Sequence, residues 1–328
     1  MSFFAVLCAL LVEQLKPLPR SNWIHDGLIS WVGWAGKNFD AGRERHAWVV
    51  WGVTVLGPAA VVAACFSGIE WWNVVPALLF DVVMLYLTLG FRQFSHYFTD
   101  IRQALDRGDE IQARRLLAQW QRLDASELPR TELLRHVIEH ALLAAHRHVF
   151  GVFFWFVVLS AVGMGPAGAV LYRLAEFASR YWAFKSRTLG VPANDRLMVL
   201  SQRLFSLIDL VPSRMTAFGF AVVGNFEEAI NVWRRSAALW THANEGVILA
   251  SAAGAVGVQL GGQGIPGFAT HRSKSYDDGV SQATTAEGST PGVAPHVGHL
   301  SSVVGLVWRS VVLWMLLLAL LTLANLVG

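Results

Sequence analysis

The residues with the clearest chemical potential lie between His136 and His148, in the stretch HVIEHALLAAHRH. Its first five residues match H-x-x-E-H, a motif in which two histidines bind zinc and the glutamate activates a zinc-bound water. Residues four apart share one face of a helix, so His136 and His140 can meet one metal ion if this segment is helical. One hypothesis from this motif is therefore a metallohydrolase.

The zinc hypothesis lacks a third protein ligand nearby in the sequence. A catalytic zinc site needs three protein ligands and an open position for water. The next ionisable residues are His146, Arg147 and His148, and the next carboxylate is Glu176, beyond an apolar segment. Two alternatives stay open: a loose metal-binding or proton-sensing cluster, and solvated histidines on an interfacial helix. We favour the interfacial helix and predict no metal site.

A second candidate is the glycine-rich stretch GAVGVQLGGQG at residues 254–264. It lacks the G-K-[ST] ending of a phosphate-binding loop, and no strand pattern precedes it. Neither a Walker motif nor a dinucleotide fingerprint is therefore indicated. We interpret the glycines as positions where two backbones approach closely.

The composition indicates a membrane protein. Of the 328 residues, 54% are hydrophobic and only 15% are charged, an apolar excess over ordinary soluble proteins. A helix needs about 20 mostly apolar residues to cross a bilayer. The predicted membrane segments are a short anchor at 3–12, helices at 48–67, 74–91 and 301–328, and a hairpin or broken helix within 149–181. We predict an all-α, polytopic integral membrane protein with about five transmembrane or re-entrant helices.

The charge pattern predicts a topology and a partner. Eight arginines lie between Arg92 and Arg135, whereas the loop at 68–73 has no lysine or arginine. The positive-inside rule therefore places the arginine-rich region in the cytoplasm. The net charge is only +3 and the arginines are dispersed among loops, so we predict the lipid bilayer as a partner and no nucleic acid. Cys8 and Cys65 lie in apolar segments and indicate no disulfide.

The chain divides into five parts by composition. They are N-terminal membrane segments (1–91), a cytoplasmic helical hairpin (92–148), a core with a membrane hairpin and the glycine-rich motif (149–262), a flexible loop (263–300) and a C-terminal transmembrane helix (301–328). Within the second part, Gly108 suits the end of one helix and the start of the next. The fourth part is rich in Gly, Ser, Thr and Pro, a composition typical of a loop.

Four stretches match longer patterns. NEGVILASAAGAVGVQLGG (244–262) resembles N-A-G-W-P-E-A-A-M-A-G-A-L-G-V-R-L-G-G without a gap, and GPAGAVLYRLAE (165–176) resembles G-x-P-G-A-L-L-Y-R. LVPSRMTA (210–217) resembles W-I-P-A-R-L-T-A, and IRQALDRGDEIQARRLL (101–117) resembles A-L-x-x-G-D-x-x-x-A-R. These are patterns of the CobD/CbiB family of integral membrane proteins, which the chain resembles over roughly residues 75 to 262.

The resemblance implies a role in cobalamin biosynthesis at the bacterial inner membrane, with a multi-pass chain. The family enzyme uses ATP to join an aminopropanol phosphate to the carboxylate of adenosylcobyric acid, so ATP, magnesium and a corrinoid substrate are implied if this chain is catalytic. Retained family residues imply a site. Those with implied catalytic roles are Glu139 (base or metal group), Arg173 and Arg214 (phosphate or carboxylate partners), and those implied to bind substrate are Tyr172, Asn244, Gly254, Gly257, Gly261 and Gly262.

Several polar positions of the family pattern are replaced in this chain. Near Glu139, the family's A-x-I-E-S-x-A-E-N-x-x-D-G pattern has lost a Glu, an Asn, an Asp and a Gly to Leu143, Ala144, Arg147 and His148. Further replacements are Ser179, Phe205, Ser206, Leu249 and Gln259. Amide ligation needs positioned polar groups to carry developing charge, so catalysis by this chain stays an open question. His140 replaces a family serine, which makes the zinc-like motif a product of substitution.

An alternative is the related AmpE branch of the superfamily. AmpE proteins resemble this chain in ALLVEQL near the N-terminus, in AGRERHAW (41–48) and in Asp209 of LIDLVPSRM. They also lack the family's Glu-Asn-Asp set. This resemblance implies a non-catalytic membrane signalling or regulatory protein instead of an amide ligase.

Overall fold

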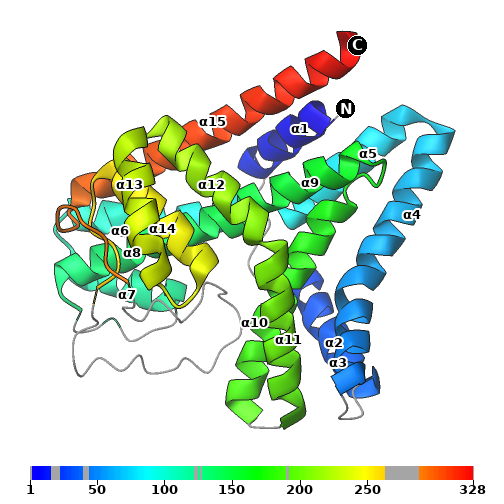
Figure 1. Cartoon of the computed structure of the whole chain (residues 1–328), viewed down its shortest axis with the longest axis horizontal. Coiled ribbons are helices and arrows are strands. Elements are labelled where there is room, and N and C mark those ends of the chain that lie inside the picture. Colours follow the sequence, from blue (N-terminus) through cyan, green and yellow to red (C-terminus); the bar gives the residue numbers. More distant parts are fainter. Residues whose placement is uncertain are drawn as a thin grey trace. The chain divides into compact units, whose positions relative to one another are not determined.

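The structure is a computed structural model that describes residues 2–15, 23–39, 44–121, 125, 128–189, 192–262 and 288–327 (Figure 1). These residues are almost entirely helical. The only extended pairing among them is two isolated bridges, Val258 with Val293 and Gly261 with Ser289. The predicted all-α class is confirmed.

The described elements are helices, which follow one another along the chain. They are α1 (Ser2–Leu15), α2 (Trp23–Phe39), α3 (Glu44–Trp51), the π-helical turn η1 (Gly52–Leu56), α4 (Gly57–Trp72), α5 (Val74–Thr88), α6 (Phe91–Asp106), α7 (Glu110–Gln121), α8 (Arg130–Ala145), the π-helical turn η2 (His146–Phe150), α9 (Gly151–Ala161), α10 (Ala167–Leu189), α11 (Pro192–Ile208), α12 (Leu210–Val223), α13 (Phe226–Ser236), the 3₁₀ turn η3 (Ala237–Leu239), α14 (Ala243–Val256) and α15 (Val297–Val327).

Three described helical segments are long and apolar enough to cross a membrane: His46–Trp72, Arg130–Ala161 and Val297–Ala324. A fourth span is available if α11 and α12, which meet at a bend of 48°, act as one broken helix. Asp209 lies at that bend, and Pro212 in the first turn of α12 has no N–H to extend α11. The chain therefore has the apolar helices that a polytopic membrane protein requires.

The remaining predicted membrane segments are shorter in the structure. The segments at 3–12 and 74–91 correspond to α1 and α5, both apolar but under 18 residues. The segment that starts at 149 continues a helix that already begins at Arg130. Of the loop predicted for 263–300, residues 263–287 lie outside the described residues. Its last residues belong to α15, which begins at Val297.

The chain forms two compact units, each assembled from separate stretches of sequence. The first unit contains residues 1–93, 147–210 and 318–328, and the second contains 94–146 and 211–317. In the first unit α10 packs along α11 and against α9 (Figure 1). A tight turn with positive φ at Gly163 and Gly165 joins α9 to α10. Gly168 permits the close approach, because a side chain there would collide with the Trp155 carbonyl.

In the second unit α13 and α14 lie side by side (Figure 1). Gly254 makes this possible, since a Cβ at that position would collide with the carbonyl of Glu228 on α13. Helix α14 then ends at Gly257, whose φ of 77° is the left-handed conformation that glycine adopts most readily. After α14 the chain continues to Gly261 and Gly262, which are part of the candidate site.

Candidate functional site

A buried carboxylate meets the glycine-rich loop in the second unit. Glu139 on α8 is only 2% exposed, and its Oε1 accepts a hydrogen bond of 2.7 Å from the backbone N–H of Gly261. Among the described residues, no hydrogen bond reaches the other oxygen, Oε2. An ionised carboxylate has acceptor sites on both oxygens. The Oε2 oxygen of Glu139 can therefore still bind a partner while the hydrogen bond to Oε1 holds the side chain in place.

Arg135 holds the same loop from one helical turn earlier. Its Nη1 donates to the carbonyls of Gly261 and Gly262, the second at 3.5 Å, and its Nη2 pairs with Glu132. The peptide of Gly261 is thus engaged on both sides: its N–H by Glu139 and its carbonyl by Arg135. We call Arg135, Glu139, Gly261 and Gly262 the Glu139 clamp.

The clamp requires glycine in the loop. Gly261 and Gly262 have φ values of 72° and 109°, which strain any side chain. A Cβ at Gly261 would also collide with the carbonyl of Gly288. The clamp therefore depends on backbone conformations that only glycine adopts readily.

A second segment fastens the loop from its other side. Thr290 Oγ1 accepts from the backbone N–H of Leu260 at 2.7 Å and its N–H donates to the Leu260 carbonyl at 2.9 Å. The N–H of Gly262 donates to the carbonyl of Gly288. Residues 257–262 and 288–293 are consequently held together at the base of the intervening segment.

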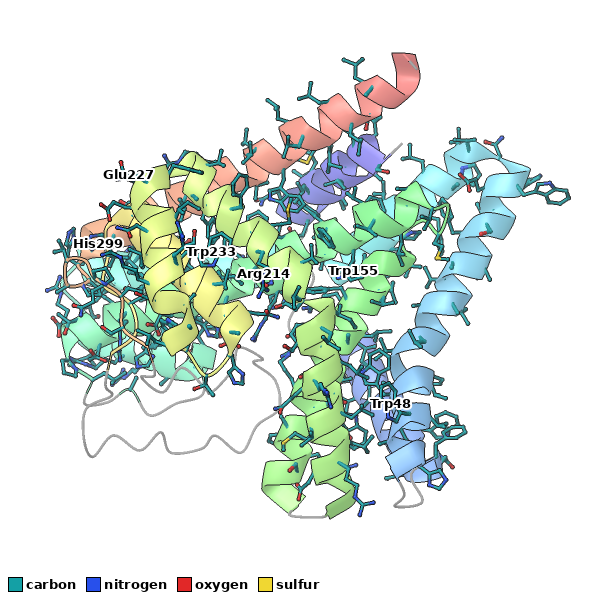
Figure 2. The ribbon with its side chains drawn as sticks, viewed as in Figure 1. Trp48, Trp155, Arg214, Glu227, Trp233 and His299 are labelled. Carbon is teal, nitrogen blue, oxygen red and sulfur yellow. The ribbon has the colours of Figure 1, made fainter. Side chains whose placement is uncertain are left out.

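A polar pair lies near the start of α14 in the same unit. Arg214 on α12, labelled in Figure 2, donates from Nη1 to Oδ1 of Asn244 at 3.1 Å. Helix α14 packs against α8, and Glu245, next to Asn244, interacts electrostatically with Glu139. Seven of the predicted site residues lie in the second unit, and among them Glu139 contacts Gly261 and Arg214 contacts Asn244; the seven are Glu139, Arg214, Asn244, Gly254, Gly257, Gly261 and Gly262.

Gly254 and Gly257 have structural explanations of their own. Gly254 allows α13 and α14 to touch, and Gly257 ends α14. Of the four glycines, Gly261 and Gly262 belong to the Glu139 clamp, where their carbonyls accept hydrogen bonds from Arg135 and the N–H of Gly261 donates to Glu139. Substrate binding by all four glycines stays a prediction.

Tyr172 belongs to the first unit and is fully buried on α10. Its hydroxyl donates to Oδ1 of Asp209 at 2.7 Å, and its ring lies 5.7 Å from that of Phe205. Gly151 makes room for the ring, because a Cβ there would collide with it. This is the arrangement of a structural tyrosine whose polar end is satisfied.

Arg173 also lies in the first unit, in an ion cluster along α10. Its Nη1 donates to Oε2 of Glu176 at 3.3 Å, and Arg180 pairs with Glu176 at 2.5 and 2.9 Å. Glu176 is 1% exposed, while the two arginines are about one-fifth exposed. Arg173 and Arg180 thus compensate one buried carboxylate.

The histidines of the opening motif pack as neighbours of other side chains. The ring of His140 meets Trp120 edge-on at 4.3 Å, and His146 Nδ1 lies 2.9 Å from Thr216 Oγ1. No group of three His, Cys, Asp or Glu side chains suited to a metal ion occurs in the part of the chain that the structure describes. His140 is 6% exposed and His146 1% exposed, so the expectation of solvated histidines is wrong for these two.

Two residues that organise these sites, Arg135 and Thr290, are not among the residues predicted from the sequence. Arg135 was detectable because it lies one turn before Glu139, and a charged residue in an apolar helix usually has a specific partner. Thr290 had no such signal, since its partner Leu260 is brought close only by folding. Leu143 and Ala144, which replace polar residues of the family pattern, are buried in α8.

The chain was compared with known proteins. It matches the model of the family described as CobD/Cbib protein over residues 4–290. It is 31% identical over 327 residues to "Cobalamin biosynthesis protein CobD" of Stutzerimonas stutzeri (strain A1501), covering 96% of each chain. A protein of the same name from Chromobacterium violaceum is 32% identical over 221 residues, or 65% of this chain and 67% of the relative.

A more distant relative carries the same name. "Cobalamin biosynthesis protein CobD" of Leptospira interrogans serovar copenhageni is 24% identical over 189 residues, 56% of this chain and 57% of that protein. No solved structure matches the chain. The family match over nearly the whole chain, together with near full-length identity above 30%, shows that the protein belongs to the CobD/CbiB family of cobalamin biosynthesis proteins.

Proposed function

We propose that the protein joins an aminopropanol phosphate to the carboxylate of adenosylcobyric acid in an ATP-dependent amide ligation. The observation that carries this proposal is the Glu139 clamp: a buried carboxylate, retained from the family pattern, with one oxygen held by Gly261 and the other without a partner among the described residues. The family membership supports the pathway, and the clamp supports a working site within it.

The chemistry requires a proton acceptor and charge stabilisation. ATP activates the corrinoid carboxylate by transferring a phosphoryl group to one of its oxygens. The amine nitrogen then forms the new C–N bond, the phosphorylated oxygen leaves as inorganic phosphate, and one proton leaves the nitrogen. Glu139 suits the role of that proton's acceptor, because its free oxygen can reach a substrate while Gly261 keeps the side chain in place.

The cationic side chains suit the phosphate groups of the substrates. In the second unit, Arg214 has a planar guanidinium that can bind phosphate or carboxylate while Asn244 fixes its orientation. In the first unit, Arg173 is partly exposed beside Glu176 and is the other candidate phosphate partner. We propose Arg214 for the phosphate of the amine substrate or for ATP.

Magnesium fits the site as an ion shared with ATP. Mg²⁺ is commonly bound by one or two carboxylates together with substrate phosphates and water. Glu139 offers one carboxylate oxygen for this purpose. When bound, the ion would neutralise phosphate charge, and Glu139 would then serve as its ligand instead of as the proton acceptor.

We propose the bacterial inner membrane as the location, with several membrane passes. The apolar helical segments supply the spans. The eight arginines between Arg92 and Arg135 favour a cytoplasmic position for that region. Glu139 then lies in the cytoplasmic third of the candidate span Arg130–Ala161, on the side of the membrane where ATP is present.

Complementation tests the ligase proposal. The gene is expressed in a bacterial strain that lacks its own adenosylcobinamide-phosphate synthase, and growth that depends on cobalamin synthesis is measured. We expect the unchanged chain to restore growth, Glu139→Gln to fail, and the surface variant Asp106→Asn to succeed. Asp106 is a matched control because its carboxylate is half exposed and, among the residues that the structure describes, pairs only with Arg102 on α6.

Membrane insertion of each variant is measured by immunoblotting of the membrane fraction. If the unchanged chain inserts normally and does not restore growth, the ligase proposal is wrong and the AmpE-like regulatory alternative gains support. If Glu139→Gln restores growth as well as the unchanged chain, the role given to Glu139 is wrong.

A further inference from the structure

One face of α12 presents an exposed apolar stripe. Its residues recur at intervals of four, three and four positions and are each between 41% and 48% exposed: Val211, Met215, Phe218 and Val222. The spacing places them on one side of the helix. Since α12 is half of a candidate membrane span, this stripe is suited to contact with lipid chains.

The stripe continues onto α13, the next helix in the second unit. Asn225 caps the start of α13 through its side chain, which accepts from the N–H of Glu228. The ring of Phe226, 51% exposed, then meets Phe218 edge-on at 6.2 Å. The apolar surface of α12 therefore passes without interruption to the first turn of α13.

Helix α13 changes from acidic to basic along its length, with one aromatic residue, Phe226, at its start. Its inner face, with Ala229, Val232 and Ser236, is buried. Its first turn carries Glu227 and its last turn Arg234 and Arg235. Figure 2 shows Glu227 and Trp233 on this helix. Both arginines are exposed, and neither forms an ion pair with a described residue.

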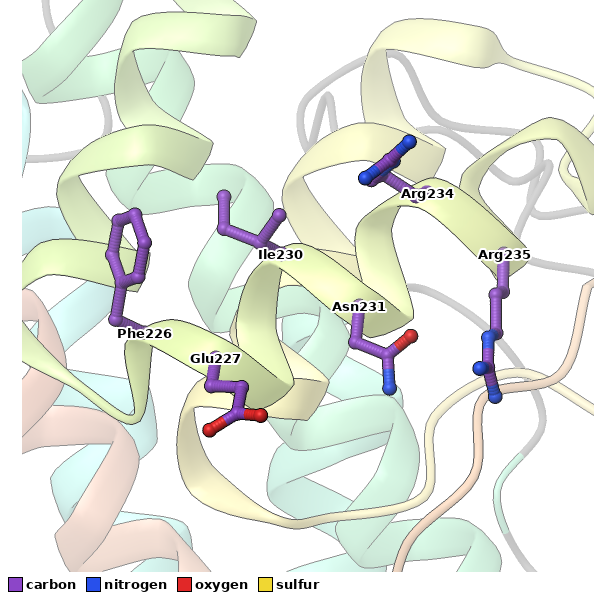
Figure 3. A pocket seen from close by; sticks show the side chains of 6 residues that line it. All are labelled: Phe226, Glu227, Ile230, Asn231, Arg234 and Arg235. Atoms are coloured by element: carbon purple, nitrogen blue, oxygen red, sulfur yellow. The ribbon is translucent and has the colours of Figure 1, made fainter.

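The outer face of α13 contains a hollow of about 570 Å³. It is lined by Phe226, Glu227, Ile230, Asn231, Arg234 and Arg235 (Figure 3). In Figure 3 the side chains of Phe226, Ile230 and Arg234 extend to one side of the helix, and those of Glu227, Asn231 and Arg235 extend to the other. The hollow thus has Phe226 and Ile230 along one side, next to the α12 stripe, Glu227 opposite Phe226, and a basic end at the two arginines.

We propose that this hollow binds one phospholipid with an anionic head group. The acyl chain lies against Phe226 and Ile230 and continues along the α12 stripe. The phosphate lies between Arg234 and Arg235, which donate to its oxygens, and the Asn231 amide supplies a further hydrogen bond. Glu227 repels the phosphate from the opposite end, so the orientation of the lipid is fixed.

A lipid fits these observations better than a small anion does. A free phosphate would use the two arginines and leave Phe226 and Ile230 in water. An uncharged apolar partner would leave both arginines without a counter-charge. Only an amphiphile satisfies both the apolar side and the basic end of the hollow, and phospholipid is the amphiphile that surrounds a membrane protein.

The test measures lipid binding to the purified full-length protein. Delipidated protein in mild detergent is titrated with phosphatidylglycerol or phosphatidylcholine, and bound lipid is counted by native mass spectrometry. Each basic side chain near an anionic lipid surface contributes roughly fivefold in affinity, so Arg234→Gln with Arg235→Gln should weaken phosphatidylglycerol binding by roughly 25-fold. Binding of phosphatidylcholine should change little.

Matched controls separate this site from general charge effects. Arg102→Gln with Arg107→Gln removes the same charge from α6 and from the residue that follows it in the same unit, and should leave binding unchanged. Phe226→Ala should weaken binding of a long-chain phosphatidylglycerol but not that of a six-carbon-chain analogue, because only the long chain reaches the apolar side of the hollow. Thermal unfolding in detergent checks that each variant is folded.

Three results would overturn the proposal. The first is equal loss of binding in the α6 and α13 double variants. The second is equal affinity for phosphatidylglycerol and phosphatidylcholine in the unchanged protein. The third is binding of inorganic phosphate as tight as that of the lipid, which would make the hollow a simple anion site. None of these measurements depends on ligase activity.

Discussion

Glu139 and Glu176 are both buried glutamates on helices, yet their surroundings differ. Glu176, in the first unit, lies between Arg173 and Arg180 of its own helix: Oε2 accepts hydrogen bonds from both arginines, and Oε1 forms an ion pair with Arg180 but no hydrogen bond. Glu139, in the second unit, has one oxygen held by the backbone of Gly261, which is 122 residues away in sequence. One carboxylate is neutralised locally, and the other is held in place by a distant loop.

The difference separates a structural carboxylate from a candidate reactive one. A buried charge must be paired or hydrogen-bonded to be tolerated. Glu176 meets this requirement through ion pairs with residues three and four positions away. Glu139 meets it in part, through Gly261 and the nearby charge of Arg135, and keeps an oxygen for a ligand. Partial satisfaction of a buried group is what a binding or catalytic site requires.

The largest effect should come from the structural carboxylate. Glu176→Gln removes the charge that compensates Arg173 and Arg180, and breaking a buried pair in this way should lower the free energy of unfolding by about 3 kcal/mol. Thermal or denaturant unfolding in detergent measures this change. The exposed pair of Arg102 and Asp106 is the control, because Asp106→Asn should cost less than about 0.5 kcal/mol. Equal losses in both variants would mean that Glu176 has no special structural role.

The next largest effect should appear in activity. Glu139→Gln keeps an oxygen that accepts from Gly261 but loses the carboxylate charge, so the rate of amide formation should fall by about 100-fold. Mass spectrometry of the amide product formed by protein in lipid nanodiscs measures the rate. The free energy of unfolding should change much less than it does for Glu176→Gln. If the variant instead unfolds easily but keeps its activity per folded molecule, Glu139 is a structural residue, as Glu176 is.

Arg135 should behave as a positioning residue for Glu139. Arg135→Gln removes charged donors from the carbonyls of Gly261 and Gly262, at a cost of about 2 kcal/mol. The loop should then shift and kcat should fall by more than KM changes. Arg135→Lys should restore part of the loss, since an ammonium can still donate to one carbonyl. If Lys and Gln behave alike and kcat per folded molecule is unchanged, Arg135 supports the fold only.

The smallest effect should come from Tyr172. Tyr172→Phe keeps the buried ring but removes the hydrogen bond to Asp209, which should lower the free energy of unfolding by about 1.5 kcal/mol. Activity per folded molecule should stay the same if Tyr172 is structural. A fall in activity of tenfold or more without loss of stability would instead support the substrate-binding role that the family resemblance implies for this residue.

Much of the fold is predictable from the sequence because it depends on local pattern. Long apolar stretches such as 48–67 and 301–328 can only be accommodated as helices in a bilayer, where every backbone polar group must be satisfied within the segment. Gly108 separates α6 from α7, and glycines in GMGPAG form the turn between α9 and α10. The sequence pattern did not reveal that each compact unit combines distant stretches of chain, because a local pattern does not show which distant segments contact one another.

The candidate site was only partly predictable. Glu139, Gly261 and Gly262 were identified by their match to family patterns, and the structure brings them into direct contact. The same patterns did not distinguish Glu139 from Tyr172 or Arg173, whose partners lie within the first unit and satisfy them there. The burial of His140 beside Trp120 was also missed, since an apolar helix that carries histidines has the same sequence whether it faces water or a neighbouring ring.

The sequence by itself determined the helical class, the apolar segments and the family, because hydropathy and motif matches depend on residues that are close together in the sequence. Only the tertiary structure decided which polar residues work together. Glu139 meets Gly261 across 122 positions, and Thr290 meets Leu260 across 30. Such pairs form when packing places the chain segments side by side, and the energy of burying a polar group then requires that each one finds its partner.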